Sequence, residues 1–296
     1  MVSSPRQEPG VAVRRLRRRP SILRRVPVFP LLVILLVLVI PALFAEVIAP
    51  HSPFAGSLGR RLQPPSFLGG PSEHLFGTDA QGRDILSRII FGARVSAIVA
   101  AAGLFIGGAV GVTLGLFAGY FGGWADAIIS RMAEVTMSVP IILVAIVLAT
   151  AIGASFTSVV IIVALYLWSV YARQTRAETL KWRESLFVKR ARVVGCSNLR
   201  ILFRHILPNM VNTLIVLVTL QVGFVIVFEA SLSFVGVGIP RPNPAWGLMV
   251  SEGRDFVLTA WWVPFFPGAA IVLTVLAFNL LGDWLRDQLD PRLRQV

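Results

Sequence analysis

Long uncharged apolar runs limit most strongly how this chain can fold. Residues 95–119 contain no charged side chain, and about 20 apolar residues in a helix suffice to cross a bilayer. Charged residues make up only 15% of the 296 residues, and the mean hydropathy is +0.76. Soluble domains average about 25% charged residues, so an ordinary water-soluble domain is excluded.

Six stretches are long and apolar enough to span a membrane, which predicts an all-α polytopic membrane protein with six transmembrane helices. The predicted spans are 28–49, 95–119, 128–152, 156–172, 211–235 and 263–282. The first apolar stretch is too long for a cleaved signal peptide and is followed by a poor cleavage sequence, so we expect it to be retained.

The basic residues predict the orientation. Residues 1–27 carry eight arginines and residues 173–204 carry nine lysines and arginines, whereas 50–94 carry five and 237–262 two. Because short cytoplasmic loops concentrate Lys and Arg, we predict that both termini lie inside. The net charge of +13 is then explained by basic cytoplasmic segments, and we expect no nucleic-acid partner. The N-terminal segment contains a block of arginines at 14–19, which we expect to contact anionic lipid. Regulatory or nucleic-acid binding by this block is the alternative.

This orientation gives a predicted organisation in five parts. They are a basic cytoplasmic tail at 1–27, a first transmembrane helix at 28–49, an extracytoplasmic loop at 50–94, a core of five transmembrane helices at 95–283 and a cytoplasmic tail at 284–296. Proline and glycine predict an irregular loop up to about residue 82. A short helix is expected from Arg83, with Thr78 or Asp79 near its start and a surface pair between Asp84 and Arg88.

Several kinds of chemistry are excluded by residue counts. The single cysteine, Cys196, forms neither an intrachain disulfide nor a cysteine-based zinc site. Neither of the two lysines follows a glycine, so the chain has no nucleotide-binding P-loop. The histidines His51, His74 and His205 are scattered, so we expect no metal site, no catalytic centre and no cofactor bound by this chain.

A glycine at every fourth position marks one face of the second span. The stripe comprises Gly103, Gly107, Gly111, Gly115 and Gly119. Small residues at this spacing let two helices approach closely in lipid. The stripe is therefore a packing interface, either within this chain or with a second subunit.

Three charged residues in the spans are candidates for a translocation path or gate, because charge at membrane depth is costly. Arg131 and Glu134 lie three residues apart and are expected to neutralise each other. Glu229 has no basic neighbour in the sequence. It is expected to pair with a partner chain, face an aqueous path, contact the amino group of a peptide, or have a structural role.

The stretch 173–209 is long for a connection between spans and is predicted to fold. Residues 177–194 favour a helix, Gly195 breaks it, and Ser197 begins a second short helix through Arg204. A basic, partly apolar cytoplasmic segment suits a docking surface, and an interfacial helix on the lipid headgroups is the alternative.

The segment 189–208 resembles the EAA loop of ABC importer permeases, in which Glu-Ala-Ala is followed by three residues, Gly, nine residues, Ile, any residue and Leu-Pro. The matching positions are Ala191, Gly195, Leu207 and Pro208. The departures are Lys189 for Glu, Arg190 for Ala and His205 for Ile.

Further matches in the same order resemble one subfamily, the C-type permeases of dipeptide, oligopeptide and nickel importers. They lie at 74–88, 119–140, 204–209, 229–247 and 278–292. The first contains the extracytoplasmic family residues Gly77, Asp79, Gly82, Arg83 and Asp84.

The resemblance implies a type I importer permease fold and a non-catalytic subunit of the bacterial cytoplasmic membrane. The implied partners are a homologous B-type permease, one or two ATPase subunits that carry ATP and magnesium, and an extracytoplasmic binding protein. It places the loop at about 174–208 in a groove of an ATPase. The implied coupling residues are Lys189, Arg190, Ala191, Arg192, Gly195, Cys196, Ser197, Arg204, His205, Leu207 and Pro208.

Within that loop, Gly195 is expected to permit a sharp turn and Pro208 to end the second short helix. Short peptides are the expected substrate, with nickel, glutathione or haem as alternatives. A secondary transporter is the remote rival, but it predicts internal repeats or coupling carboxylates and leaves the folded loop unexplained.

Overall fold

The computed structural model describes residues 27–289, and this part of the chain is helical with one isolated β-bridge between Thr78 and Asp84. Five helices are long and apolar enough to cross a membrane, and a bent pair makes up to six. The prediction of an all-α polytopic membrane protein is therefore confirmed. The arginine block and residues 290–296 of the predicted tail lie outside the described residues.

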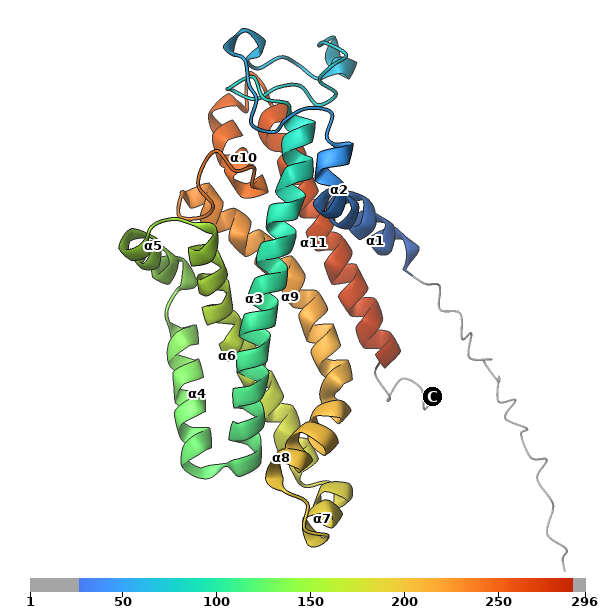
Figure 1. Ribbon diagram of the computed structural model, residues 1–296, viewed down its shortest axis with the longest axis vertical. Helices are drawn as coiled ribbons and strands as arrows, with labels where there is room; N and C mark the ends of the chain where they lie inside the picture. The colour runs from blue at the N-terminus through green and yellow to red at the C-terminus, as the bar shows by residue number, and fades with distance from the viewer. Residues whose placement is uncertain (1–26, 290–296) are drawn as a thin grey trace, which may run out of the picture.

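The helices gather into a bundle with a distinct structure at each end (Figure 1). The long helical stretches are α1 (Val28–Val33), η1 (Ile34–Val39) and α2 (Ile40–Ile48) in succession, α3 (Ile85–Phe121), α6 (Phe156–Arg183), α8 (Asn198–Arg200) with η4 (Ile201–Ile206) and α9 (Leu207–Val235), and α11 (Trp262–Leu289). The shorter helices are α4 (Gly123–Ser138), α5 (Ile141–Ile152), α7 (Leu186–Val193) and α10 (Trp246–Gly253).

One end, here called the loop end, carries residues 50–84 and α10 (Figure 1). The loop contains only two single 3-10 turns, η2 (Leu58–Arg60) and η3 (Ser66–Leu68), and a third such turn, η5 (Arg254–Phe256), follows α10. The opposite end, called the coupling end, carries α7 and α8.

The glycine stripe of α3 packs against α6 of the same chain, which decides between the two alternatives left by the sequence. A Cβ atom at any of the five glycines would collide with α6. The nearest α6 side chains are Val163 at Gly103, Leu167 at Gly107, Tyr171 at Gly111, Thr175 at Gly115 and Thr179 at Gly119. Both series advance in steps of four, so the two helices run parallel and in register over residues 103–119 of α3 and 163–179 of α6.

Two prolines inside spanning helices are accommodated by π-helical turns. The π-turn η1 ends two residues before Pro41, and η4 ends two residues before Pro208. Proline lacks the N–H of the regular α-helical bond and clashes with the preceding turn, and a wider turn relieves both problems. The prediction that Pro208 ends a short helix is therefore wrong, because the helix continues from Asn198 to Val235.

The predicted third span is broken rather than continuous. Helices α4 and α5 meet at an angle of 86°. Val139 is extended because a residue before proline is disfavoured in the α conformation, and Pro140 is the N-cap residue that precedes α5. The predicted span 128–152 runs through Pro140, which instead breaks the helix.

The glycine stripe predicts a sharp difference between two glycines of α3. Gly111→Ala places a Cβ against the Trp168 carbonyl on α6, whereas at Gly108 the nearest atom lies 3.8 Å away. We expect Gly111→Ala to destabilise the fold by about 1–3 kcal/mol through overpacking. Gly108→Ala should be neutral or stabilising because alanine favours helix by about 1 kcal/mol. Thermal unfolding of the two variants in detergent measures the difference; equal midpoints would contradict the close packing.

Candidate functional site

The connection between α6 and α9 folds into a short helix and two turns. Helix α6 ends at Arg183, Ser185 is extended, and α7 follows. The single helix predicted over 177–194 is therefore divided, and Ser185 is the residue that breaks it. Lys189 Nζ lies 3.4 Å from the Glu184 carboxylate, and this contact lowers the pKa of Glu184.

Gly195 makes the turn that reverses the chain between α7 and α8. Its φ is +82°, a left-handed conformation that glycine adopts without strain, and no atom lies near the position of a Cβ. The Cys196 N–H donates to the Ala191 carbonyl at 3.0 Å, which closes the end of α7. Ser197 stands at the start of α8 without a side-chain capping bond.

A buried apolar cluster fixes this connection to the coupling end of α3. Val188 of α7 and Ile201, Leu202 and Ile206 of η4 are each 0% exposed. They pack in one cluster with Leu116 and Tyr120 of α3 and with Met210 of α9. Because these contacts come from three helices, α7 is packed against the ends of α3 and α9 and is not a free loop.

Tyr120 adds polar contacts to the same anchor. Its hydroxyl donates to Asn198 Oδ1 at 3.0 Å and accepts from Arg192 Nε at 3.3 Å, and the Arg192 guanidinium lies 5.0 Å from the centre of its ring. Arg183 donates to the Gly119 carbonyl at 3.1 Å. The coupling connection is thereby tied to the last turn of α3 by hydrogen bonds and a cation–π contact.

The outer face of this connection exposes apolar side chains among basic ones. Val193 is 88% exposed and Val194 82%. We call the exposed face of α7 and α8 the coupling surface; it comprises Leu186, Lys189, Arg190, Arg192, Val193, Val194, Leu199 and Arg200. Of the other predicted coupling residues, Gly195, Ser197, Arg204 and Pro208 are exposed and Ala191, Cys196, His205 and Leu207 are half-buried. Exposed valines beside charged side chains are typical of an interaction surface.

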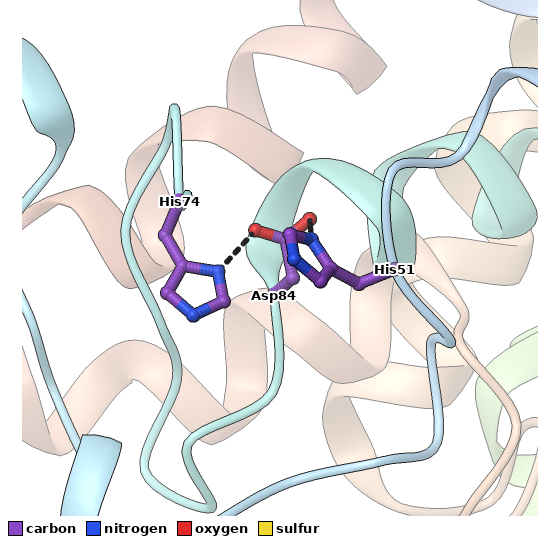
Figure 2. A group of neighbouring side chains, drawn as sticks. All are labelled: His51, His74 and Asp84. Carbon is purple, nitrogen blue, oxygen red and sulfur yellow. Dashed lines mark hydrogen bonds and ion pairs between the residues drawn. The ribbon is translucent and has the colours of Figure 1, made fainter. Parts of the chain in front are cut away.

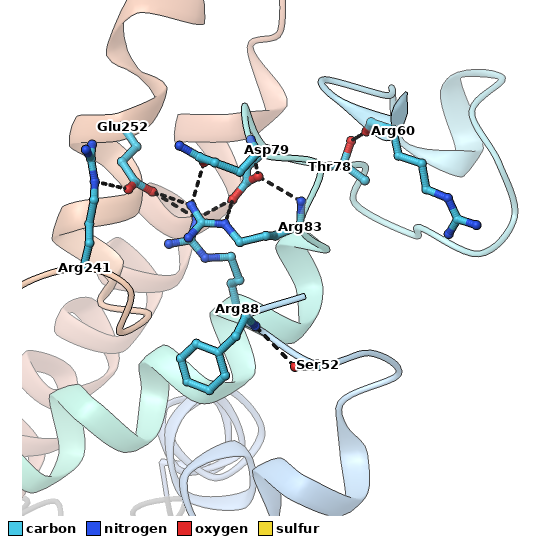
Figure 3. A network of polar contacts seen from close by, with 10 residues as sticks. Ser52, Arg60, Thr78, Asp79, Arg83, Arg88, Arg241 and Glu252 are labelled. Carbon is cyan, nitrogen blue, oxygen red and sulfur yellow. Dashed lines mark hydrogen bonds and ion pairs between the residues drawn. The ribbon is translucent and has the colours of Figure 1, made fainter. Parts of the chain in front are cut away.

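At the loop end, two carboxylates and three arginines form a largely buried network (Figure 3). Asp79 accepts from Arg83 Nε at 2.7 Å and from Arg88 Nη1 at 2.5 Å. Glu252 of α10 accepts from the same two arginines at 3.2 and 3.0 Å and from Arg241 at 2.7 Å. Asp79, Arg83, Arg88 and Glu252 are all at least nine-tenths buried. The network therefore joins the loop, the start of α3 and α10.

The expected pair between Asp84 and Arg88 is wrong. Arg88 points to Asp79 and Glu252, and Asp84 instead caps α3 by accepting from the Ser87 N–H at 2.8 Å. The helix also begins at Ile85 and continues as α3, so it is not a separate short helix. A cap residue satisfies a free backbone N–H, and here that preference outweighs a surface pair four residues apart.

Gly77 and Gly82 shape the loop beside this network. Both have positive φ, and a Cβ at either would strike loop backbone. The loop therefore folds closely on itself next to Asp79. Sequence reasoning missed Glu252 and Arg241, because residues so far from Asp79 share no spacing pattern with it.

Two of the scattered histidines are brought together at the loop end. His74 Nδ1 lies 2.9 Å from Asp84 Oδ1, and the ring centres of His51 and His74 are 4.9 Å apart. His205, predicted to lie on the other side of the membrane, is not part of this contact. Sequence separation gave no indication of it.

The charged residues placed in the spans occupy different environments. Arg131 Nη1 and Glu134 Oε2 form the expected ion pair at 3.0 Å, with both side chains exposed on α4. Glu229 is 1% exposed and accepts from Ser233 at 2.7 Å and Ser96 at 3.4 Å. Its carboxyl thus lies inside the contact between α9 and α3 in this conformation. A gating or path-lining role for the three residues stays a prediction.

Comparison with known proteins adds the family. Residues 111–295 match the family described as binding-protein-dependent transport system inner membrane component. The chain belongs to this family. The permease is thus a multi-pass protein of the bacterial cytoplasmic membrane.

Three relatives illustrate the similarity. The glutathione transport system permease protein GsiD of Pectobacterium atrosepticum is 45% identical over 76% of this chain and 75% of its own length. A putative peptide transport system permease protein of Brucella suis is 41% identical over 89% and 87%. The dipeptide transport system permease protein DppC of Alkalihalophilus pseudofirmus is 41% identical over 89% and 85%. The resemblance to ABC importer permeases of the dipeptide and oligopeptide type is therefore confirmed.

The buried network predicts that its carboxylates matter more than exposed ones in the same loop. Asp79→Asn leaves Arg83 and Arg88 short of a buried counter-charge, and breaking such a pair costs about 3–5 kcal/mol. Glu73 pairs with Arg60 at 3.1 Å with both side chains more than half exposed, and exposed pairs contribute about 0–1 kcal/mol. We expect Asp79→Asn, but not Glu73→Gln, to lower the thermal midpoint and to expose residues 50–84 to protease. The same thermal midpoint and the same protease sensitivity in both variants would contradict a stabilising role for the buried network.

Proposed function

We propose that the permease is one membrane subunit of an ATP-driven importer, paired with a homologous permease and served by separate ATPase subunits and an extracytoplasmic binding protein. The coupling surface is the observation that carries the proposal. It combines exposed valines with basic side chains on a rigidly anchored connection, which is the form a docking element needs.

Force applied to the coupling surface would be transmitted through the helices that anchor it. The buried cluster couples α7 to α3 and α9, and the glycine stripe couples α3 to α6. ATP-driven closure of a docked ATPase therefore moves these helices as a unit between inward-open and outward-open states. Gly195 supports this role because its turn holds α7 and α8 together as one rigid element.

The proposed orientation places the coupling end and both termini in the cytoplasm. The basic residues of 1–27 and 173–204 support it through the preference of Lys and Arg for the cytoplasmic side. The loop end then faces the extracytoplasmic space, where residues 50–84 and α10 form the surface nearest to a binding protein.

Short peptides are the proposed substrate class, and glutathione, itself a small peptide, is the second candidate. The names of the relatives support both, since they include peptide, dipeptide and glutathione transport permeases. Nickel and haem remain alternatives with no relative of that name among these three. In such systems the binding protein selects the substrate, so substrate choice is tested on the complex.

Docking is tested by a charge placed on the coupling surface. Val193→Glu changes a side chain that is 88% exposed, so the fold should persist while ATPase binding falls about tenfold or more, as for a central interface residue. Leu258→Glu is the matched control, because Leu258 is 98% exposed at the loop end. Co-purification of the ATPase with each variant is the measurement. Undiminished recovery with Val193→Glu would contradict docking at this surface.

Energy coupling is tested in cells that carry the complete transporter. Uptake of labelled dipeptide, and separately of glutathione, should stop when ATP is depleted and persist with an uncoupler while ATP is maintained. Uptake that persists when ATP is depleted but stops with an uncoupler would identify a secondary transporter. Competition between the two substrates shows which is preferred.

A further inference from the structure

Three side chains with metal-ligating atoms converge at the loop end (Figure 2). His51 follows α2, His74 lies in the middle of the loop, and Asp84 caps α3. One ligand atom from each lies within 4.8 Å of the other two. Figure 2 shows the Asp84 carboxylate between the two imidazole rings, so three separate segments of the chain contribute to one cluster.

The spacing of these atoms suits a small divalent ion. His74 Nδ1 lies 2.9 Å from Asp84 Oδ1, and His51 Nδ1 lies 3.9 Å from Asp84 Oδ2. Ligands at about 2.1 Å from zinc are separated by about 3.0–3.4 Å from one another in octahedral or tetrahedral geometry. The two separations that involve Asp84 bracket this range, and all three ligand atoms lie within 4.8 Å of one another. Rotation of the side chains would therefore be needed to bring all three onto one ion.

Two imidazole nitrogens in this cluster lack hydrogen-bond partners although they are buried. They are Nδ1 of His51 and Nε2 of His74. The His74 side chain is nine-tenths buried or more, whereas the His51 side chain is about one-third exposed. Buried polar atoms are normally paired, so the unpaired Nδ1 of His51, which lies 3.9 Å from Asp84 Oδ2, indicates a missing ligand. On His74 it is Nδ1 that contacts Asp84, and the unpaired Nε2 is the other ring nitrogen.

The backbone around the cluster holds its side chains in place. The His51 N–H donates to Ser87 Oγ at 3.0 Å, and the same hydroxyl donates to Asp84 Oδ2 at 2.7 Å. The His74 carbonyl accepts from Ser66 and Gly77. Ser87 therefore orients a carboxylate and a histidine-bearing segment together, as outer-shell groups do around bound metals.

A pocket of about 230 Å³ adjoins the three side chains. It is also lined by Ser52, Ser57 and Arg60, and the Arg60 guanidinium donates to Glu73 at 3.1 Å. The pocket leaves room for water as a further ligand, and the arginine beside it is already paired with a carboxylate.

We propose that His51, His74 and Asp84 form a binding site for a divalent transition-metal ion of the zinc class. Two imidazoles and one carboxylate suit borderline ions such as Zn²⁺, whereas Ca²⁺ and Mg²⁺ prefer oxygen ligands alone. The ion clamps the segment after the first helix to the loop and to the start of α3. The site stands apart from the coupling end and does not depend on what the permease transports.

Metal binding is tested on the full-length protein purified in detergent with a tag that contains no histidine, after treatment with a chelator. Titration with Zn²⁺ by calorimetry should show one ion per chain and a raised thermal midpoint. Titration with Co²⁺ should give visible absorption bands that differ from those of the hydrated ion. A wild-type protein that takes up neither ion would overturn the proposal.

Three variants assign the site. His51→Ala removes a side chain that is about one-third exposed and whose Nδ1 makes no hydrogen bond. The fold should therefore persist while Zn²⁺ affinity falls at least about tenfold, since ligand loss exceeds the 10–100-fold cost of outer-shell changes. Asp84→Asn keeps a good helix cap and should also lose affinity. His205→Ala, at the coupling end, should bind as the wild type does. Unchanged affinity in His51→Ala, or equal loss in His205→Ala, would overturn the assignment.

Discussion

The close contact between α3 and α6 is the interaction on which the rest of the structure depends. Glycine at every fourth position of α3 lets its backbone lie against α6 over several turns, and tight van der Waals contact is the main source of association between helices in lipid. With α3 held in this way, both of its ends become fixed points for other segments.

The two ends of α3 then carry the two candidate sites. At its start, Asp84 caps the helix and faces two histidines, while Arg88 joins the buried network with Glu252 of α10. At its end, Tyr120 holds Arg192 and Asn198. One continuous helix, α3 from Ile85 to Phe121, therefore joins the two candidate sites.

Much of the fold could be predicted from the sequence, since hydrophobic length and glycine spacing are local signals. Errors arose where tertiary contacts overrode a local preference. Pro208 lies inside a continuous helix because the π-turn before it accommodates the proline ring. Pro140, in contrast, interrupts the predicted third span. Likewise Arg88 pairs with Glu252, far away in sequence, rather than with Asp84, because a desolvated arginine gains more from two buried carboxylates than from a surface partner.

The sequence by itself determined that this is a polytopic membrane protein of a binding-protein-dependent importer family, and it predicted where a coupling connection would lie. Apolar length, basic loops and ordered motifs act over short stretches and need no contact map. The tertiary structure alone decided that the glycine stripe faces α6, that Glu252 completes the buried network and that His51 meets His74 at Asp84. These pairings join segments with no fixed spacing, so only the folded chain brings them within contact distance.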